Sequence, residues 1–83
     1  VRRAAMDKCY AEGKSFLRSI PEGVFTVPGD PEGCVDFETV FQLLDTYHYE
    51  GWLVVEAEQD PAKANPLDYA RMARDYVRKH TGL

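Results

Sequence analysis

The sequence predicts an α/β protein of which these 83 residues form one part. Three observations lead to this prediction. A short apolar run at residues 52–55 has the composition of a buried strand. It lies between two segments with helical periodicity, an alternation that is typical of α/β folds. A lone strand cannot satisfy its own backbone hydrogen bonds, so we expect its neighbours to come from outside the chain.

The N-terminal part predicts one weak helix followed by a long loop. Residues 2–18 have poorly periodic apolar positions, and Gly13 interrupts them. Proline and glycine then punctuate the segment from Pro21 to Gly33, in which residues 24–27 could be briefly extended. Loops of this kind are more often functional than accidental, although a linker would have the same composition.

A clearer helix is predicted to begin after Asp36, which suits the N-cap, and to end before Gly51. Its apolar residues follow the i, i+3, i+4, i+7 pattern of one helix face: Val40, Leu43, Leu44 and Tyr47. After the loop 58–64, Asn65 is expected to cap a last helix that has Pro66 at its first position and Gly82 as its stop. The apolar stripe of that helix consists of Tyr69, Ala70, Ala73, Tyr76 and Val77.

The predicted strand runs from an apolar core into two carboxylates. Period-two alternation places Trp52, Val54, Glu56 and Glu58 on one face and Leu53, Val55 and Ala57 on the other. Trp52 is expected in the core. An ionised carboxylate in a covered sheet costs several kcal/mol without a partner, so Glu56 most needs one. The residues alone leave open whether that partner is a site or a helix Lys or Arg.

Composition excludes several classes of function. Fourteen acidic residues against ten basic ones argue against nucleic acid as the main partner. No apolar run approaches the roughly 20 residues that span a bilayer. Cys9 and Cys34 are too few and too distant for a metal or disulfide framework, which favours free thiols in a reducing cytoplasm. The start at Val1, with no apolar leader, indicates a chain that begins within a longer protein.

Several strings in order carry a resemblance to a known family. They are GVFTVPGD at 23–30, VDF at 35–37, WLVVEAEQDPAKA at 52–64 and Tyr69-Ala70. Over roughly residues 14–77 the chain resembles the C-terminal end of the inosose dehydratases, which are xylose-isomerase-like (β/α)8 TIM barrels. The resemblance implies that residues 1–83 supply the last βα loop, helix seven, strand eight and helix eight of a barrel, which is not a complete domain.

The resemblance also implies a metal site. In this superfamily two Glu, an Asp and a His hold a divalent metal at the barrel mouth, and the last Glu ends strand eight in a G-x-x-x-x-E pattern that Gly51 to Glu56 match. Glu56 is therefore the expected ligand, and the other three ligands lie outside this chain. Glu58 is expected to be solvated or to support the ligand from outside. His48 and His80 are expected at the surface or in packing.

The implied activity is a hydro-lyase of myo-inositol catabolism that dehydrates 2-keto-myo-inositol (scyllo-inosose), a polyol ketone, in the cytoplasm. Mn²⁺ or Co²⁺, or else Mg²⁺, and glutathione are the cofactors that the resemblance implies. Glu56 could be ligand, general base or both. Gln59, Lys63 and Phe25 could contact substrate at the mouth, although loop solvation or a plain turn explains them equally well.

Two other functions remain open at this stage. A sugar or hydroxypyruvate isomerase or epimerase of the same barrel superfamily would share the strand-eight Glu. Alternatively, the chain is a small interaction module in which Glu56 is only an ion-pair partner. In the barrel interpretation, either the rest of the barrel or self-association must cover the strand edges. No membrane or nucleic-acid partner is expected.

Overall fold

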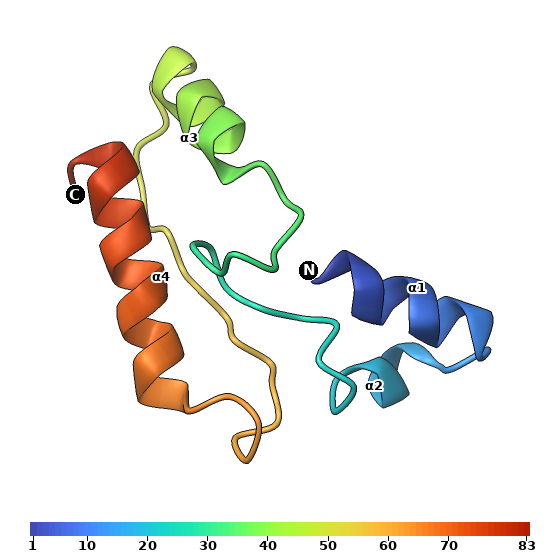
Figure 1. Ribbon diagram of the computed structural model, residues 1–83. Helices are drawn as coiled ribbons and strands as arrows, with labels where there is room; N and C mark the ends of the chain where they lie inside the picture. The colour runs from blue at the N-terminus through green and yellow to red at the C-terminus, as the bar shows by residue number, and fades with distance from the viewer.

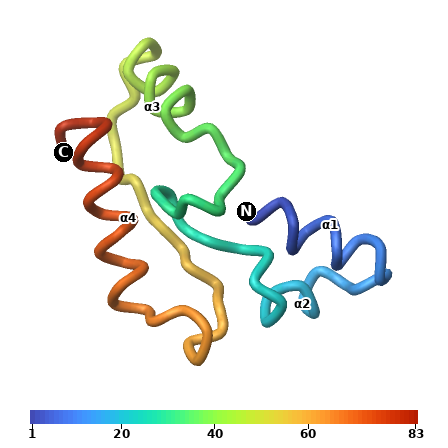
Figure 2. Tube along the Cα trace, in the orientation of Figure 1, coloured from blue at the N-terminus to red at the C-terminus, as the bar shows by residue number.

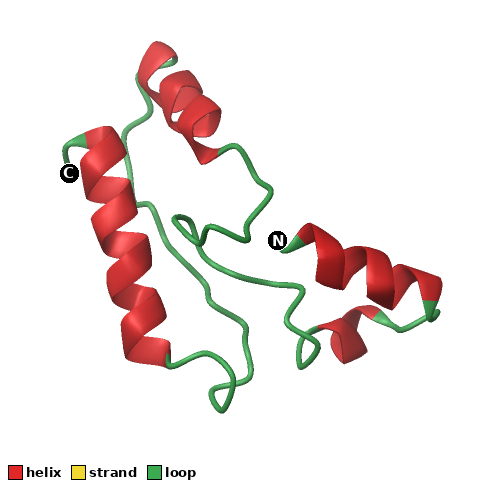
Figure 3. Ribbon diagram, viewed as in Figure 1, coloured by secondary structure: helices red, strands yellow, loops and turns green.

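The structure, a computed structural model, describes all residues 1–83 and contains four helices and no β-strand (Figure 1, Figure 3). The helices are α1 (Arg3–Ala11), α2 (Phe16–Ser19), α3 (Phe37–Thr46) and α4 (Pro66–Thr81). No helix has both the length and the apolar character needed to cross a membrane. Of the predicted alternation of helices and a strand, the structure contains the helices but not the strand.

The predicted N-terminal helix is present as two pieces that part at Gly13. That residue has a φ of +67°, a backbone conformation that glycine adopts without steric cost. Ser15 then begins α2 as its N-cap and accepts a hydrogen bond from the backbone N–H of Arg18 at 3.3 Å. The interruption predicted at Gly13 is confirmed.

The predicted caps of the two longer helices are also confirmed. Asp36 Oδ1 accepts from the Thr39 backbone N–H at 3.1 Å. A hydrogen bond from the Thr39 hydroxyl, and then this backbone bond, lower the pKa of the Asp36 carboxyl. Asn65 Oδ1 accepts from two backbone N–H groups at the start of α4, with Pro66 in the first position. Gly82 closes α4 in the left-handed conformation.

The face of α3 that packs differs from the predicted stripe. Val40, Leu43 and Tyr47 are exposed. Instead the Phe41 ring lies 6.2 Å from the Tyr76 ring of α4, and Tyr76 in turn lies 4.3 Å from the His80 ring. The pattern identified the helix correctly but not the face that contacts α4. Apolar residues occur on more than one face of α3, and α4 is the one helix that covers it.

The predicted strand does not form as a hydrogen-bonded strand. Residues 50–59 run beside α4 as an extended segment, seen in yellow and light orange in Figure 2, and none of their backbone N–H groups donates to another group of the chain. The physical reason is the absence of a neighbour: a strand exists only when another strand pairs with its backbone. The predicted strand is therefore not confirmed in this chain by itself, and its pairing with outside partners stays a prediction.

The alternation of side chains along the extended segment follows the prediction in part. Leu53, Val55 and Ala57 line an open apolar groove of about 650 Å³ against α4, and Trp52, predicted on the opposite face, lines it too. Val54 and Glu56 are exposed on the other side. Trp52, expected in the core, is 88% exposed, because nothing in these residues covers it. The expectation for Trp52 is wrong for the chain by itself.

The buried core is small for a chain of this length. Only six residues are buried, with Ala73 and Val27 the least exposed. The radius of gyration is 14.0 Å, whereas a compact domain of this length has about 12 Å. A core this small leaves little apolar burial to offset the conformational entropy lost on folding. That residues 1–83 are one part of a larger domain stays a prediction.

We expect the 83-residue chain by itself to unfold without a cooperative transition, because its apolar groove and extended segment remain uncovered. Thermal and urea unfolding followed by circular dichroism, with size-exclusion chromatography for association, would measure this. A sharp transition in a monomer would contradict the expectation and favour an independent module.

Candidate functional site

The guanidinium of Arg2 gathers three separate parts of the chain. Its side chain is 14% exposed, and it binds residues of the 23–32 loop, the end of the extended segment and α4. Its partners are the Gly23 carbonyl at 2.9 Å, the Phe25 carbonyl at 3.0 Å, Gln59 Oε1 at 3.0 Å, the Tyr69 hydroxyl at 3.0 Å, Asp30 Oδ2 at 2.9 Å and Glu32 Oε2 at 3.2 Å. We refer to these residues as the Arg2 cluster.

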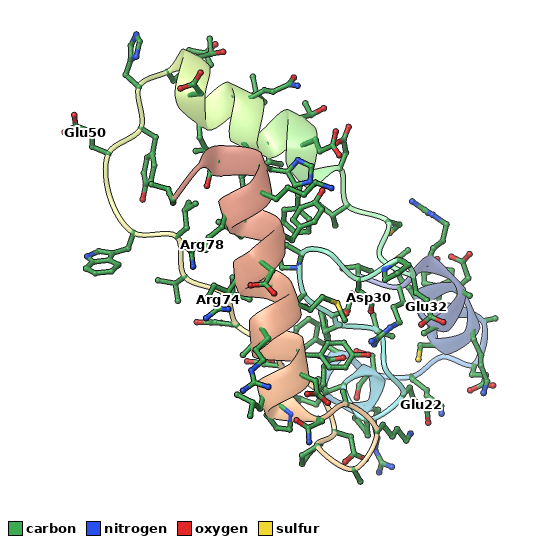
Figure 4. All side chains as sticks on the ribbon, turned by 60° about the vertical axis from the view of Figure 1, so that its left-hand side comes forward. Glu22, Asp30, Glu32, Glu50, Arg74 and Arg78 are labelled. Carbon is green, nitrogen blue, oxygen red and sulfur yellow. The ribbon has the colours of Figure 1, made fainter.

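Asp30 is the most buried acid of the cluster, with its side chain 6% exposed. Burial by itself raises the pKa of its carboxyl. Hydrogen bonds from Thr26 Oγ1 and the Glu32 backbone N–H, together with the charge of Arg2, outweigh burial and hold the pKa below its usual value. Asp30 is therefore ionised and compensates the Arg2 charge. Figure 4 shows Asp30 and Glu32 at neighbouring positions of the loop beside α1.

The loop that carries Asp30 lies directly against α4. Gly29 has a φ of +93°, and a Cβ added there would come within 2.8 Å of the Tyr76 Cβ. Only glycine suits both the backbone conformation and this approach. The Pro28-Gly29-Asp30 turn thus places the Asp30 carboxylate where Arg2 meets it.

The structure connects the three residues predicted to bind substrate to this loop, though in different ways. Phe25 packs its ring 5.2 Å from that of Phe16 and gives its carbonyl to Arg2. Gln59 gives its side-chain oxygen to Arg2. Lys63 donates from Nζ to the Pro21 carbonyl at 2.6 Å. Their predicted contact with substrate stays a prediction.

Glu56 and Glu58 are exposed, and neither forms a hydrogen bond or ion pair in the structure. The ion pair to a helix Lys or Arg that the residues left open is not observed. No group of three or more His, Cys, Asp or Glu side chains converges as a metal site would require. One exposed carboxylate does not by itself fit a divalent metal, so residues 1–83 do not hold one without further ligands.

The remaining polar residues lie where packing or solvent explains them. His48 is exposed just beyond α3, and His80 packs on Tyr76 with its Nε2 3.8 Å from Glu38. Both thiols are free, Cys9 buried and Cys34 exposed. Two open hollows, of about 700 and 650 Å³, are lined by neither Glu56 nor Gln59. The Arg2 cluster, and not a cavity, is therefore the most organised polar feature.

Sequence reasoning missed Arg2. The residue precedes α1, in a stretch without periodicity, and its neighbour Arg3 is exposed. Two of its hydrogen-bond partners are backbone carbonyls, and its four hydrogen-bond partners lie 21 to 67 positions away. The one local signal was the Pro28-Gly29-Asp30 turn, which has a restricted backbone and ends in an acid. Such an acid indicates that a basic side chain lies nearby, but not which one.

Comparison with known proteins shows what the chain is similar to. It is 54% identical over all its 83 residues to the inosose dehydratase of Clostridium beijerinckii, of which it covers 27%. It is 57% identical over 77 residues to that of Halalkalibacterium halodurans and 57% over 72 residues to that of Bacillus velezensis, covering 25% and 24% of them. No protein-family profile matches the chain.

The names of these relatives are those of an enzyme, and they imply a TIM-barrel-like fold for it. The predicted resemblance to inosose dehydratases is confirmed, and the match falls in the C-terminal part of those proteins. The chain spans about a quarter of the length of the curated relatives that it matches.

Replacing Asp30 with Asn should lower the free energy of unfolding by about 2–4 kcal/mol at neutral pH, because it removes the main buried compensation of Arg2. The folded-state pKa of Asp30 is lowered, so its contribution is complete above the ordinary Asp pKa of about 4. It is lost as the pH falls through the lowered value. The Asn variant should therefore lose less stability than the native protein below about pH 4.

Urea unfolding between pH 7 and 3, in a full-length protein that carries this sequence, measures both effects. The matched control is Asp75→Asn, since Asp75 pairs with Arg74 at 3.0 Å but is 67% exposed. The control should change stability by no more than about 0.5 kcal/mol. Equal losses in the two variants would contradict the assignment of Asp30.

Proposed function

We propose that this chain is the C-terminal part of an inosose dehydratase, a metal-dependent hydro-lyase that removes water from 2-keto-myo-inositol in cytoplasmic myo-inositol catabolism. The observation that carries the proposal is 53–57% identity to proteins of that name, over the whole chain or nearly all of it. Identity at this level along a quarter of an enzyme favours the same reaction over isomerisation or epimerisation.

Within this proposal the extended segment is strand eight of a (β/α)8 barrel, and α3 and α4 are helices seven and eight. Two features of the structure support it. The backbone N–H groups of residues 50–59 are free to pair with neighbouring strands, and apolar side chains of the segment already face α4 as in a barrel wall. Strands one and seven, from the rest of the protein, are the proposed neighbours.

The proposed role of Glu56 follows from its position at the C-terminal end of that strand, where barrel enzymes have their active sites. Its carboxylate is exposed and has no partner in the chain, so it is free to act as ligand or as base. Mn²⁺ or Co²⁺, or else Mg²⁺, is the proposed metal, and three further ligands must come from the rest of the barrel. Glutathione is proposed from the family resemblance alone.

The chemistry asks two things of the protein. A base must take the proton from the carbon next to the ketone, and the hydroxyl on the following carbon must receive a proton and leave as water while the C=C bond forms. Negative charge develops on the ketone oxygen, so donors placed at that oxygen speed the reaction. From this chain, Gln59 and Lys63 are the proposed contacts to substrate oxygens, and Phe25 is a proposed wall of the pocket.

A full-length protein that carries this sequence should convert 2-keto-myo-inositol to the enone when Mn²⁺ or Co²⁺ is present. Enone absorbance follows the reaction, and a panel of ketoses and hydroxypyruvate serves as the comparison. Turnover of the panel without the inositol ketone would overturn the proposed reaction in favour of an isomerase or epimerase. Activity of the 83-residue chain by itself would contradict the proposal that most ligands lie elsewhere.

Glu56→Gln in that full-length protein should lower kcat/KM by about 100-fold or more and reduce bound metal. Changes to residues that only support a metal ligand typically cost 10–100-fold, and a direct ligand costs at least as much. Glu58→Gln is the matched control, two residues further along the same face, and should cost less than about tenfold. Metal content by mass spectrometry and steady-state kinetics test the assignment of Glu56 as a metal ligand. Unchanged metal content and turnover in Glu56→Gln would remove the assignment.

A further inference from the structure

The guanidinium of Arg2 is engaged within the chain. Its two Nη groups donate hydrogen bonds to two backbone carbonyls, to Gln59 and to Tyr69, and it forms ion pairs with the carboxylates of Asp30 and Glu32. The Tyr69 ring also lies 5.7 Å from the Arg2 guanidinium carbon. Releasing Arg2 to meet a ligand would leave Asp30 buried without its charge partner, at a large cost. Arg2 therefore acts on other residues of the protein and not on substrate.

The contact with Arg2 fixes which way the Gln59 amide points. The oxygen and nitrogen of a glutamine amide look alike, and hydrogen bonding decides their assignment. Arg2 offers only donors, so the amide must turn its oxygen, Oε1, toward Nη2 of Arg2 at 3.0 Å. The NH₂ group, Nε2, is then directed away from Arg2.

The Gln59 Nε2 group is accessible. It makes no hydrogen bond in the structure, and no buried side-chain nitrogen or oxygen lacks a partner. Nε2 is therefore in contact with solvent, although the residue as a whole is half-buried. Its oxygen is engaged by Arg2 and its donors are free, so Nε2 is the group that Gln59 presents to a ligand.

We propose that Arg2 is a positioning residue, which holds Gln59 as a donor to an oxygen of the polyol ketone substrate. The inference rests on the proposed function and deepens it, because it assigns the polarity of one substrate contact and the residue that sets it. A donor at this position recognises the lone pairs of a ketone or hydroxyl oxygen. Asp30 and Tyr69 hold Arg2 in turn, so the 23–32 loop and α4 both contribute to the placement of Gln59.

Two substitutions at Gln59 separate the donor from the structural contact. Gln59→Glu keeps an oxygen for Arg2 but removes the donor, and Gln59→Met removes both. In the full-length protein, both should raise KM for 2-keto-myo-inositol by about 3–10-fold with little change in kcat, as expected for one lost hydrogen bond. The matched control is Gln42→Glu on α3, an exposed residue without hydrogen bonds, and KM should not change. An unchanged KM in both Gln59 variants would overturn the donor role.

A second measurement tests the action of Arg2 and needs no turnover. With glutamine side-chain amides labelled with ¹⁵N in the full-length protein, the Gln59 signal is identified by its loss in Gln59→Met. Its relaxation should report an ordered amide in the native protein and a mobile one in Arg2→Lys, since lysine lacks the planar fork. Equal mobility in both would overturn the positioning role, whether or not the proposed reaction takes place.

The kinetic coupling of the two residues completes the test. If Arg2 acts through Gln59, Arg2→Lys should raise KM in the native background but add nothing in the Gln59→Met background. Independent, multiplying effects on KM would contradict the proposal, because a purely structural Arg2 has no reason to depend on Gln59. A native protein that does not act on 2-keto-myo-inositol would refute the proposed function, and the amide measurement would still decide the role of Arg2.

Discussion

The ion pair between Arg2 and Asp30 is the contact on which the arrangement of this chain depends. The two side chains are 14% and 6% exposed, and no other ion pair in the structure is as buried. Through the other donors of Arg2, the pair joins the start of the chain, the 23–32 loop, the end of the extended segment and α4. Five buried hydrophobic residues make a small apolar core, so polar contacts have a larger share in holding these parts together.

A buried charge pair of this kind is a stronger determinant of geometry than of stability. Desolvation offsets much of the attraction between the charges, while the direction of each N–H group restricts where its acceptor can lie. The consequence reaches the candidate site, because Gln59 is one of those acceptors and stands three residues beyond Glu56. Positioning by Arg2 and ligation by Glu56 would then act at the same end of the proposed strand.

The extended segment differs from the Arg2 cluster, because its backbone N–H groups have no hydrogen-bond partners in the chain. Residues 50–59 place Leu53, Val55 and Ala57 against α4 while their N–H groups remain unpaired within the chain. Strand pairing is a property of at least two segments, so no single segment can form it by itself. The exposure of Trp52 and Glu56 has the same origin.

Local features of the fold were predictable and tertiary ones were not. Asp36, Asn65 and Gly82 define helix ends through short-range hydrogen bonds and backbone conformation, which the sequence encodes directly. The packing face of α3 and the burial of Trp52 depend on neighbours, and both expectations were wrong. For the site, strings such as WLVVEAEQDPAKA indicated the family and Glu56, but Arg2 lies 57 positions from Gln59, and no local pattern joins them.

The central claim is that residues 50–59 lack strand partners in this chain and acquire them in the longer protein. Hydrogen exchange of the backbone amides of residues 52–58, compared between the 83-residue chain and a full-length protein, tests it most directly. The account predicts rapid exchange in the chain and strong protection, by a factor of about 1,000 or more, in the full-length protein. Similar exchange in the two proteins would contradict it.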